Sequence, residues 1–207
     1  MSFMETLKKS FEVLKKNWPV LLGLTLAYQA IDISFMKLIG PGLSSGNISF
    51  FYALMFLVMW LIRVAFLCGY VPLVTNCISG KKVKLSDYKE YVTKDRFISF
   101  MYLDAIVMVV LIAGMLLLIV PGIYWSVVSI FAYFILSSSG KSKDVLKSIT
   151  DSINISSGKK WKIFGYQLLY FTAILLSALH PVVSLTLGVF VTSLYWVTIG
   201  TMFKEKV

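Results

Sequence analysis

The stretch 116-LLLIVPGIYWSVV-128 decides the fold of this chain, because an apolar run stops at Pro121-Gly122 and starts again at once. Proline and glycine end helices and favour turns. If the two residues only kinked one helix, residues 98–137 would form a span of about 40 residues, twice the length that a bilayer needs. The stretch therefore predicts a tight turn between two membrane-crossing helices.

The composition of the whole chain agrees with a membrane protein. Of the 207 residues, 58% are hydrophobic and 14% are charged, whereas soluble domains have roughly 45–50% apolar and about 25% charged residues. The length allows about six crossings of ~20 residues with their loops. We expect one integral membrane domain over residues 1–207.

Six apolar segments predict an all-α fold of six transmembrane helices. They are residues 19–39, 50–75, 98–119, 122–137, 163–179 and 182–203. The connections at 38–49, 120–122 and 179–181 are short and contain proline, so the helices form three hairpins.

The distribution of positive charge predicts the orientation of these hairpins. Four basic residues precede the first segment, six lie between the second and third, six lie between the fourth and fifth, and two follow the last. These are 18 of the 20 basic residues, and only Lys37 and Arg63 lie elsewhere. The positive-inside rule then places both termini and both long loops in the cytoplasm of a plasma-membrane protein.

A basic amphipathic stretch precedes each hairpin. In the first, Met4, Leu7, Phe11, Leu14 and Trp18 follow helical spacing, with lysines between them. Residues 85–92 and 146–153 repeat that spacing. Such helices lie in the cytoplasmic interface, with an attraction of ~1 kcal/mol per basic residue to anionic lipid. The pattern also suggests a three-fold repeat of units 1–78, 79–137 and 138–207. The matches between the units are short and inexact, so a chance similarity explains them equally well.

The charge has a lipid explanation, so nucleic acid is not an expected partner. Another membrane protein or a second copy of the chain is an alternative partner to the anionic bilayer. The residues expected at the lipid interface are Lys8, Lys15, Lys16, Trp18, Lys159, Lys160 and Trp161.

Arg63 is the most informative polar residue inside a predicted crossing. A mid-helix arginine costs roughly 2.5–3.5 kcal/mol on insertion scales and normally has a partner. Asp32 on the first crossing lies at a similar predicted depth, which makes Arg63 and Asp32 a candidate pair. The pair either fixes the register of two helices or forms a site for an ion or anionic substrate.

Asp104, Gln167 and Asn76 form a second candidate group, because they have similar predicted depths towards the cytoplasmic side. They either line a wet vestibule or bind a cation. An interruption of the second helix at 68-CGYVP-72 and the shortness of the fourth are typical of transporter sites.

Catalytic and metal-binding patterns are not found in the sequence. There is no phosphate loop, no Gly-x-Ser-x-Gly elbow and no spaced carboxylate pair. His180 has no second ligand beside it, so neither a metal nor a cofactor is expected. We therefore expect a protein that is not an enzyme.

Several motifs carry a resemblance to known proteins. Pro121-Gly122-Ile123, the aromatic segment after it, 144-DVLKSITDSINISSGKKWKIF-164 and 7-LKKSFEVLKKNW-18 together resemble uncharacterised six-helix membrane families of bacteria and archaea. Those families are related to the membrane domain found beside glycerophosphoryl diester phosphodiesterases. The chain departs from their pattern at 137-SSS-139, where an acidic residue often follows the fourth crossing. The resemblance implies a fold and a compartment but no activity.

Two functions remain open from the sequence. The first is a non-enzymatic accessory or scaffold protein that binds another membrane protein or anionic lipid. The second is a small transporter or channel that uses Arg63 with Asp32, or Asp104 with Gln167.

Overall fold

The computed structural model describes residues 2–44, 50–117, 119–138, 144–177 and 181–205, and every regular element within these ranges is a helix. Within these described ranges, five helices are long and apolar enough to cross a membrane. They are Phe3–Leu38, Phe50–Ile78, Lys94–Leu117, Ile119–Ser138 and Thr186–Lys204. The all-helical fold with several possible membrane spans is thus confirmed.

Helix α8 (Lys160–Ser177) corresponds to the predicted crossing at 163–179 and is not among those five. Lys160 and Lys162 in its first turn and Gln167 near its middle lower its mean hydropathy. The arrangement of six crossings therefore stays a prediction, as does the three-fold repeat. Parts of the predicted outer connections, residues 45–49 and 178–180, lie outside the described residues.

Helix α1 (Phe3–Ser44) joins the first amphipathic stretch to the first predicted crossing. It begins with a capping box, in which the Glu5 amide donates to Ser2 Oγ at 3.2 Å and the Glu5 carboxylate accepts from the Ser2 amide. A kink at Asn17, with φ −122° and ψ 16°, separates the two parts. Pro19 contributes to the kink, because it has no amide hydrogen to donate to the Lys15 carbonyl and its ring crowds that carbonyl.

Helix α2 (Phe50–Ile78) is continuous, so the predicted interruption at residues 68–72 was wrong. Pro72 lies inside the helix. Helix α3 (Leu85–Tyr91) packs beside this part of α2, and Tyr88 occupies the space that a side chain at Gly69 would fill. The Tyr88 hydroxyl donates to the Ala65 carbonyl at 3.0 Å. Burial raises the pKa of Tyr88 to about 12, so the hydroxyl stays a donor even at alkaline pH.

Helix α4 (Lys94–Leu117) is followed by α5 (Ile119–Ser129) and α6 (Ala132–Ser138). The predicted position of the turn was wrong by a few residues, because Pro121 and Gly122 lie in the first turn of α5. A proline is tolerated there, since the first amides of a helix have no partner within it. A Cβ on Gly114 would lie 2.9 Å from the Gly122 nitrogen, so α4 and α5 touch backbone to backbone.

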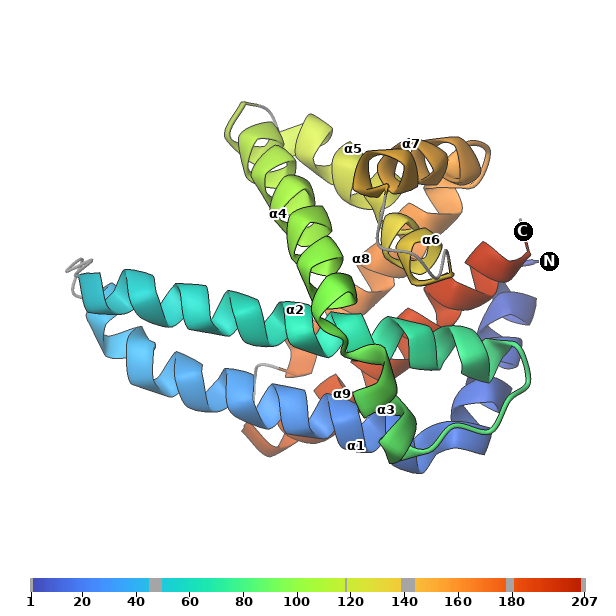
Figure 1. The fold of residues 1–207 in the computed structure, drawn as a ribbon, viewed down its shortest axis with the longest axis horizontal. Coiled ribbons are helices and arrows are strands. Elements are labelled where there is room, and N and C mark those ends of the chain that lie inside the picture. Colours follow the sequence, from blue (N-terminus) through green and yellow to red (C-terminus); the bar gives the residue numbers. More distant parts are fainter. Residues whose placement is uncertain (1, 45–49, 118, 139–143, 178–180, 206–207) are drawn as a thin grey trace.

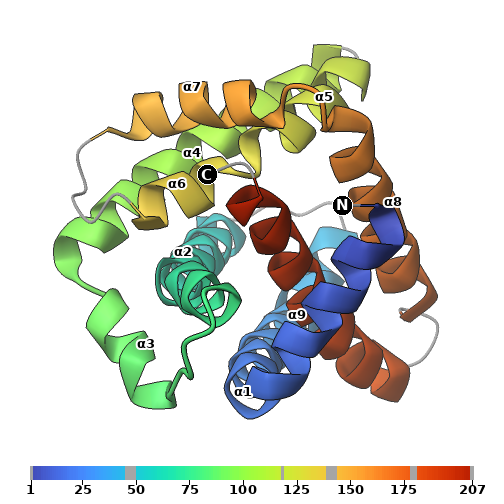
Figure 2. The same cartoon turned by 90° about the vertical axis from the view of Figure 1, so that its right-hand side faces the viewer.

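The chain ends with α7 (Val145–Ser156), α8 and α9 (Pro181–Lys204). In Figure 2, α7 lies across α5 and α6, and α9 lies beside α1. Ser152 of α7 donates to the Val128 carbonyl at 2.6 Å, next to the break at 130–131 between α5 and α6. That bond satisfies a carbonyl which the break leaves without a helical partner.

The core lies near one end of the helices. In α2 the buried residues run from Val64 to Ile78, in α4 from Ser99 to Val107, and in α5 they are mostly Val127–Ser129. The other ends carry exposed apolar side chains, such as Phe50 and Leu116. Figure 1 shows the α1/α2 pair extending to the left and the α4/α5 pair rising towards the top, away from the end where both termini lie. The pairs thus separate with distance from the core.

Candidate functional site

Asp104 on α4 is the centre of the buried polar network. Its side chain is fully buried. Trp60 Nε1 donates to Asp104 Oδ2 at 2.7 Å and the Tyr133 hydroxyl donates to Oδ1 at 2.6 Å. The two bonds bring α2, α4 and α6 together around one carboxylate.

Arg63 supplies the positive charge next to this carboxylate. Its Nη2 lies 3.5 Å from Asp104 Oδ1, and its Nη1 lies 3.9 Å from the sulfur of Met108. The arginine side chain is 37% exposed, although the carboxylate is buried. The arginine side chain is therefore still partly accessible.

The structure does not bring Arg63 and Asp32 into an ion pair. Asp32 is partly buried on α1 and interacts with Arg63 only through a longer-range Coulombic attraction. Equal depth was the basis of the predicted pair, and depth does not determine which faces of two helices meet. The ion pair predicted between Arg63 and Asp32 is instead formed between Arg63 and Asp104, a residue that the sequence placed in the other candidate group.

Gln167 and Asn76 do not join Asp104. Gln167 on α8 donates to the Ser126 carbonyl at 3.0 Å and accepts from Ser126 Oγ at 3.3 Å. Asn76 on α2 donates to the Tyr91 hydroxyl of α3. The predicted group of three is thus divided among three helix contacts, each of which satisfies its own polar groups.

The sequence analysis missed Trp60 and Tyr133 as partners of Asp104. Both have an apolar ring and one hydrogen-bond donor, and such residues usually find an acceptor when they are buried. A buried carboxylate with aromatic donors at the same depth was the signal that could have identified them.

A second polar contact between α1 and α9 was also missed. Ser193 donates to Thr25 Oγ1 at 2.9 Å, and the hydroxyl oxygens of Thr25 and Tyr70 lie within hydrogen-bond distance, 3.2 Å apart. Further along, Gln29 donates to Thr192 Oγ1 at 3.1 Å. Small hydroxyl residues let membrane helices approach closely and bond to one another, so this contact fixes α1 against α9.

The basic residues predicted at the lipid interface fall into two sets. The outward set includes Lys8, Lys15 and Lys16, which are exposed, and Trp18 and Trp161, which are 57% and 85% exposed. The other set is engaged within the protein: Lys159 pairs with Glu205 at 3.0 Å, and Lys160 donates to the Tyr124 hydroxyl at 2.8 Å. Lys141, Lys143 and Lys206 lie outside the described residues.

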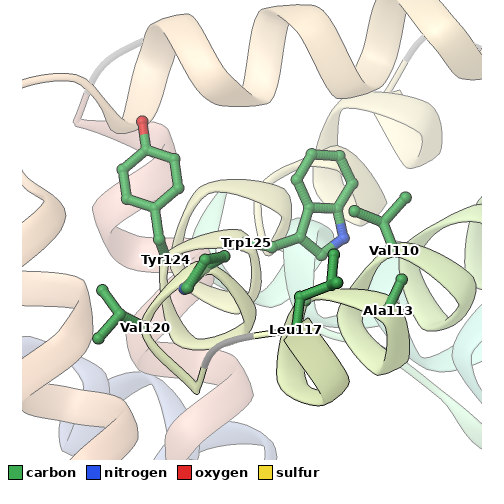
Figure 3. A pocket seen from close by; sticks show the side chains of 8 residues that line it. Val110, Ala113, Leu117, Val120, Tyr124 and Trp125 are labelled. Atoms are coloured by element: carbon green, nitrogen blue, oxygen red, sulfur yellow. The ribbon is translucent and has the colours of Figure 1, made fainter.

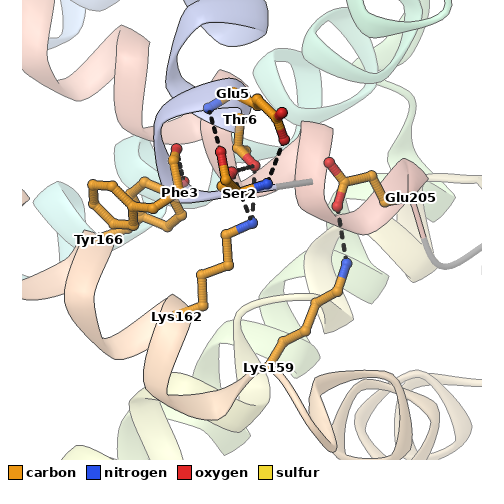
Figure 4. A network of polar contacts seen from close by, with 8 residues as sticks. All are labelled: Ser2, Phe3, Glu5, Thr6, Lys159, Lys162, Tyr166 and Glu205. Atoms are coloured by element: carbon orange, nitrogen blue, oxygen red, sulfur yellow. Dashed lines mark hydrogen bonds and ion pairs between the residues drawn. The ribbon is translucent and has the colours of Figure 1, made fainter.

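Contacts near Lys159 attach the N-terminal part of α1 to the rest of the protein (Figure 4). Lys162 donates to Thr6 Oγ1 at 2.9 Å, and the Tyr166 hydroxyl donates to the Phe3 carbonyl at 2.8 Å. The ring of Phe3 stacks on that of Tyr166 with centroids 4.2 Å apart. The beginning of α1 is therefore held by α8.

Among the described residues, no group of three His, Cys, Asp or Glu side chains is placed to hold a metal ion. Comparisons of the chain with protein-family models, with curated proteins and with solved structures found no match. The resemblance to six-helix membrane families therefore stays a prediction.

Proposed function

We propose that the chain is a non-enzymatic integral membrane scaffold that holds anionic lipid at the cytoplasmic face through its basic helices. The proposal includes six crossings with both termini in the cytoplasm. In its favour, α8 packs beside α9, and both termini lie at the same end of the molecule (Figure 1).

The proposal rests on which side chains of the N-terminal part of α1 are buried and which are exposed. Its buried residues are Thr6, Ser10, Leu14 and Asn17. Met4, Phe11 and Trp18, three residues of the predicted apolar face, are instead exposed, and they follow one another at intervals of seven residues along one stripe. An exposed apolar stripe beside lysines is the pattern of a helix lying in the membrane interface.

Electrostatic attraction adds to this apolar contact. Lys8, Lys15 and Lys16 are exposed on the same segment. At ~1 kcal/mol for each lysine near an anionic surface, the three together contribute about 3 kcal/mol. A neutral bilayer lacks this contribution, so the contact depends on lipid charge.

The test measures how deeply Trp18 enters the bilayer. The protein is placed in nanodiscs of brominated phosphatidylcholine, with or without phosphatidylglycerol, and the Trp18 signal is taken as the difference between the wild type and Trp18→Phe. Bromine quenches fluorescence on contact, so we expect stronger quenching when phosphatidylglycerol is present. Absence of quenching in both lipids would overturn the proposal.

A charge variant separates attraction to anionic lipid from simple burial. We expect the triple variant Lys8→Gln, Lys15→Gln, Lys16→Gln to lose the increase in quenching that phosphatidylglycerol causes. The matched control replaces three exposed lysines between α2 and α3, namely Lys81, Lys82 and Lys84, with glutamine. An equal loss in the control would contradict a specific role for α1.

Passage of a small anion is a second candidate function, which the 37% exposure of the Arg63 side chain favours. The test compares chloride flux into liposomes that contain the wild type, Arg63→Leu with Asp104→Leu, or Arg63→Lys. A site for anions predicts flux in the wild type that the double leucine variant loses and the lysine variant partly keeps. Equal flux from well-folded proteins would reject this function and assign the pair a structural role.

A further inference from the structure

Two apolar grooves meet at the first turns of α5. One has a volume of about 560 Å³ and lies between α4 and α5 (Figure 3). The other has a volume of about 490 Å³ and lies between α5 and α8. Val120 and Tyr124 line both grooves, so these two side chains form the wall between them.

The linings follow from helical spacing. Val120, Ile123, Tyr124 and Val127 line the second groove and occur at positions i, i+3, i+4 and i+7 of α5, which is one face of a helix. Four residues of α4 line the first groove with the same spacing: Val110, Ala113, Gly114 and Leu117. Two adjoining apolar grooves, each lined along a helix face, suit hydrocarbon chains.

The second groove has a polar end at Lys160. The Lys160 ammonium donates to the Tyr124 hydroxyl at 2.8 Å and lies 4.8 Å from the centre of the Tyr124 ring. Trp161, almost fully exposed, lines the same groove. An ammonium with further donors, a tyrosine hydroxyl and an interfacial tryptophan are the groups that meet a lipid phosphate.

The charge of the grooves selects the occupant. Of the residues that line them, Lys160 is basic and none is acidic. The neighbouring Lys159 is neutralised by Glu205, and Lys162 donates to Thr6 on α1. Lys160 is therefore the charge available to an anionic headgroup at this place.

We propose that the two grooves hold one anionic diacyl phospholipid, with a chain on each side of Tyr124 and the phosphate at Lys160. The inference rests on the proposed function, because it names one particular site for the anionic lipid that the scaffold is proposed to hold. Apolar contact alone gives no preference over bulk lipid, whose chains are equally apolar. Selectivity comes from the Lys160–Tyr124 pair, and the two chains give the site its shape.

The test is native mass spectrometry of the protein purified in detergent with equal amounts of phosphatidylglycerol and phosphatidylcholine. We expect one phosphatidylglycerol per chain, and weaker retention of lyso-phosphatidylglycerol, which has a single chain. Retention of both headgroups in equal amounts would overturn the proposal. A dimer without lipid would do so too, since a second copy would then fill the grooves.

Three variants locate the site. Lys160→Gln is expected to reduce the preference for phosphatidylglycerol about fivefold, which corresponds to the ~1 kcal/mol of one lysine. Tyr124→Phe keeps the ring and is expected to reduce the preference less. Val120→Trp fills both grooves from a side chain that is 75% exposed, so the core stays intact and lipid retention is lost. Lys147→Gln on α7 is the control and is expected to retain the lipid.

The outcomes separate this inference from the proposed function. The triple glutamine variant of α1 keeps Lys160 and is expected to retain the bound phosphatidylglycerol while it loses the lipid-dependent quenching of Trp18. Unchanged retention in Lys160→Gln and Val120→Trp would overturn the lipid site alone. Quenching that does not depend on phosphatidylglycerol would overturn the lipid-charge dependence of α1 and leave the site in place.

Discussion

Removal of the Tyr133 hydroxyl is expected to weaken the protein through Asp104. The substitution Tyr133→Phe deletes the donor that lies 2.6 Å from Asp104 Oδ1. It keeps the ring, which packs at centroid distances of 6.3 Å from Phe100 and 6.1 Å from Trp196. The change therefore isolates one hydrogen bond to a buried carboxylate.

The expected loss follows from the surroundings of that bond. Hydrogen bonds to charged groups contribute about 1.5–3 kcal/mol, and more is lost when a buried acceptor has no other donor. Asp104 keeps the Trp60 donor at 2.7 Å and the Arg63 charge at 3.5 Å. The free energy of unfolding should therefore fall by about 2 kcal/mol, in the middle of the range for a charged hydrogen bond.

The measurement is reversible unfolding in mixed detergent micelles, followed by circular dichroism. Tyr102→Phe on α4, the helix that carries Asp104, is the matched control, because Tyr102 is exposed and the identical atom is removed. Its effect should stay within about 0.5 kcal/mol. If Tyr133→Phe loses no more than Tyr102→Phe, Asp104 is not held as described, and the network cannot be the centre of the buried polar contacts.

Two further substitutions test contacts between helices by the same unfolding measurement. Gly69→Ala places a methyl group against the ring of Tyr88 and should lower the free energy of unfolding by about 1–3 kcal/mol. The control Gly23→Ala adds a methyl group that meets nothing within 4 Å, so the free energy of unfolding should not fall. Equal effects of the two substitutions would contradict the packing of α3 on α2. Ser152→Ala removes the donor to the Val128 carbonyl and should cost about 1–3 kcal/mol, and an unchanged free energy of unfolding would show that water or another group satisfies that carbonyl.

The sequence identified Arg63 and Asp104 as informative residues but paired them wrongly. An ionisable side chain inside an apolar segment is costly in a membrane, so its position in the sequence is enough to identify it as a candidate. Pairing depends on which helix faces which, and that information lies in tertiary packing. Gly114 and Gly122 are an example, because their close approach determines how α4 contacts α5. No periodic pattern in the sequence predicts this contact.

The N-terminal part of α1 shows a similar division between pattern and packing. Its spacing identified Met4, Leu7, Phe11, Leu14 and Trp18 as one apolar face. In the structure Leu14 is buried and Leu7 is half-buried, whereas the other three remain exposed. The spacing did not show that Thr6 and Ser10 face the rest of the protein. In membrane proteins small residues commonly form the helix contacts, so the apolar face and the buried face need not coincide.

The contact between α1 and α9 joins two helices that lie far apart in the sequence. Ser193, the partner of Thr25, is synthesised 168 residues after it. Thr201, the partner of Ser10, is synthesised 191 residues after it. At about 5–20 residues per second this delay is roughly 10–40 s. During that time each hydroxyl has an acceptor within its own helix, since Thr25 donates to the Leu21 carbonyl and Ser10 to the Thr6 carbonyl. Both hydroxyls therefore have an acceptor before α9 is made, and the contact between α1 and α9 forms only when α9 arrives.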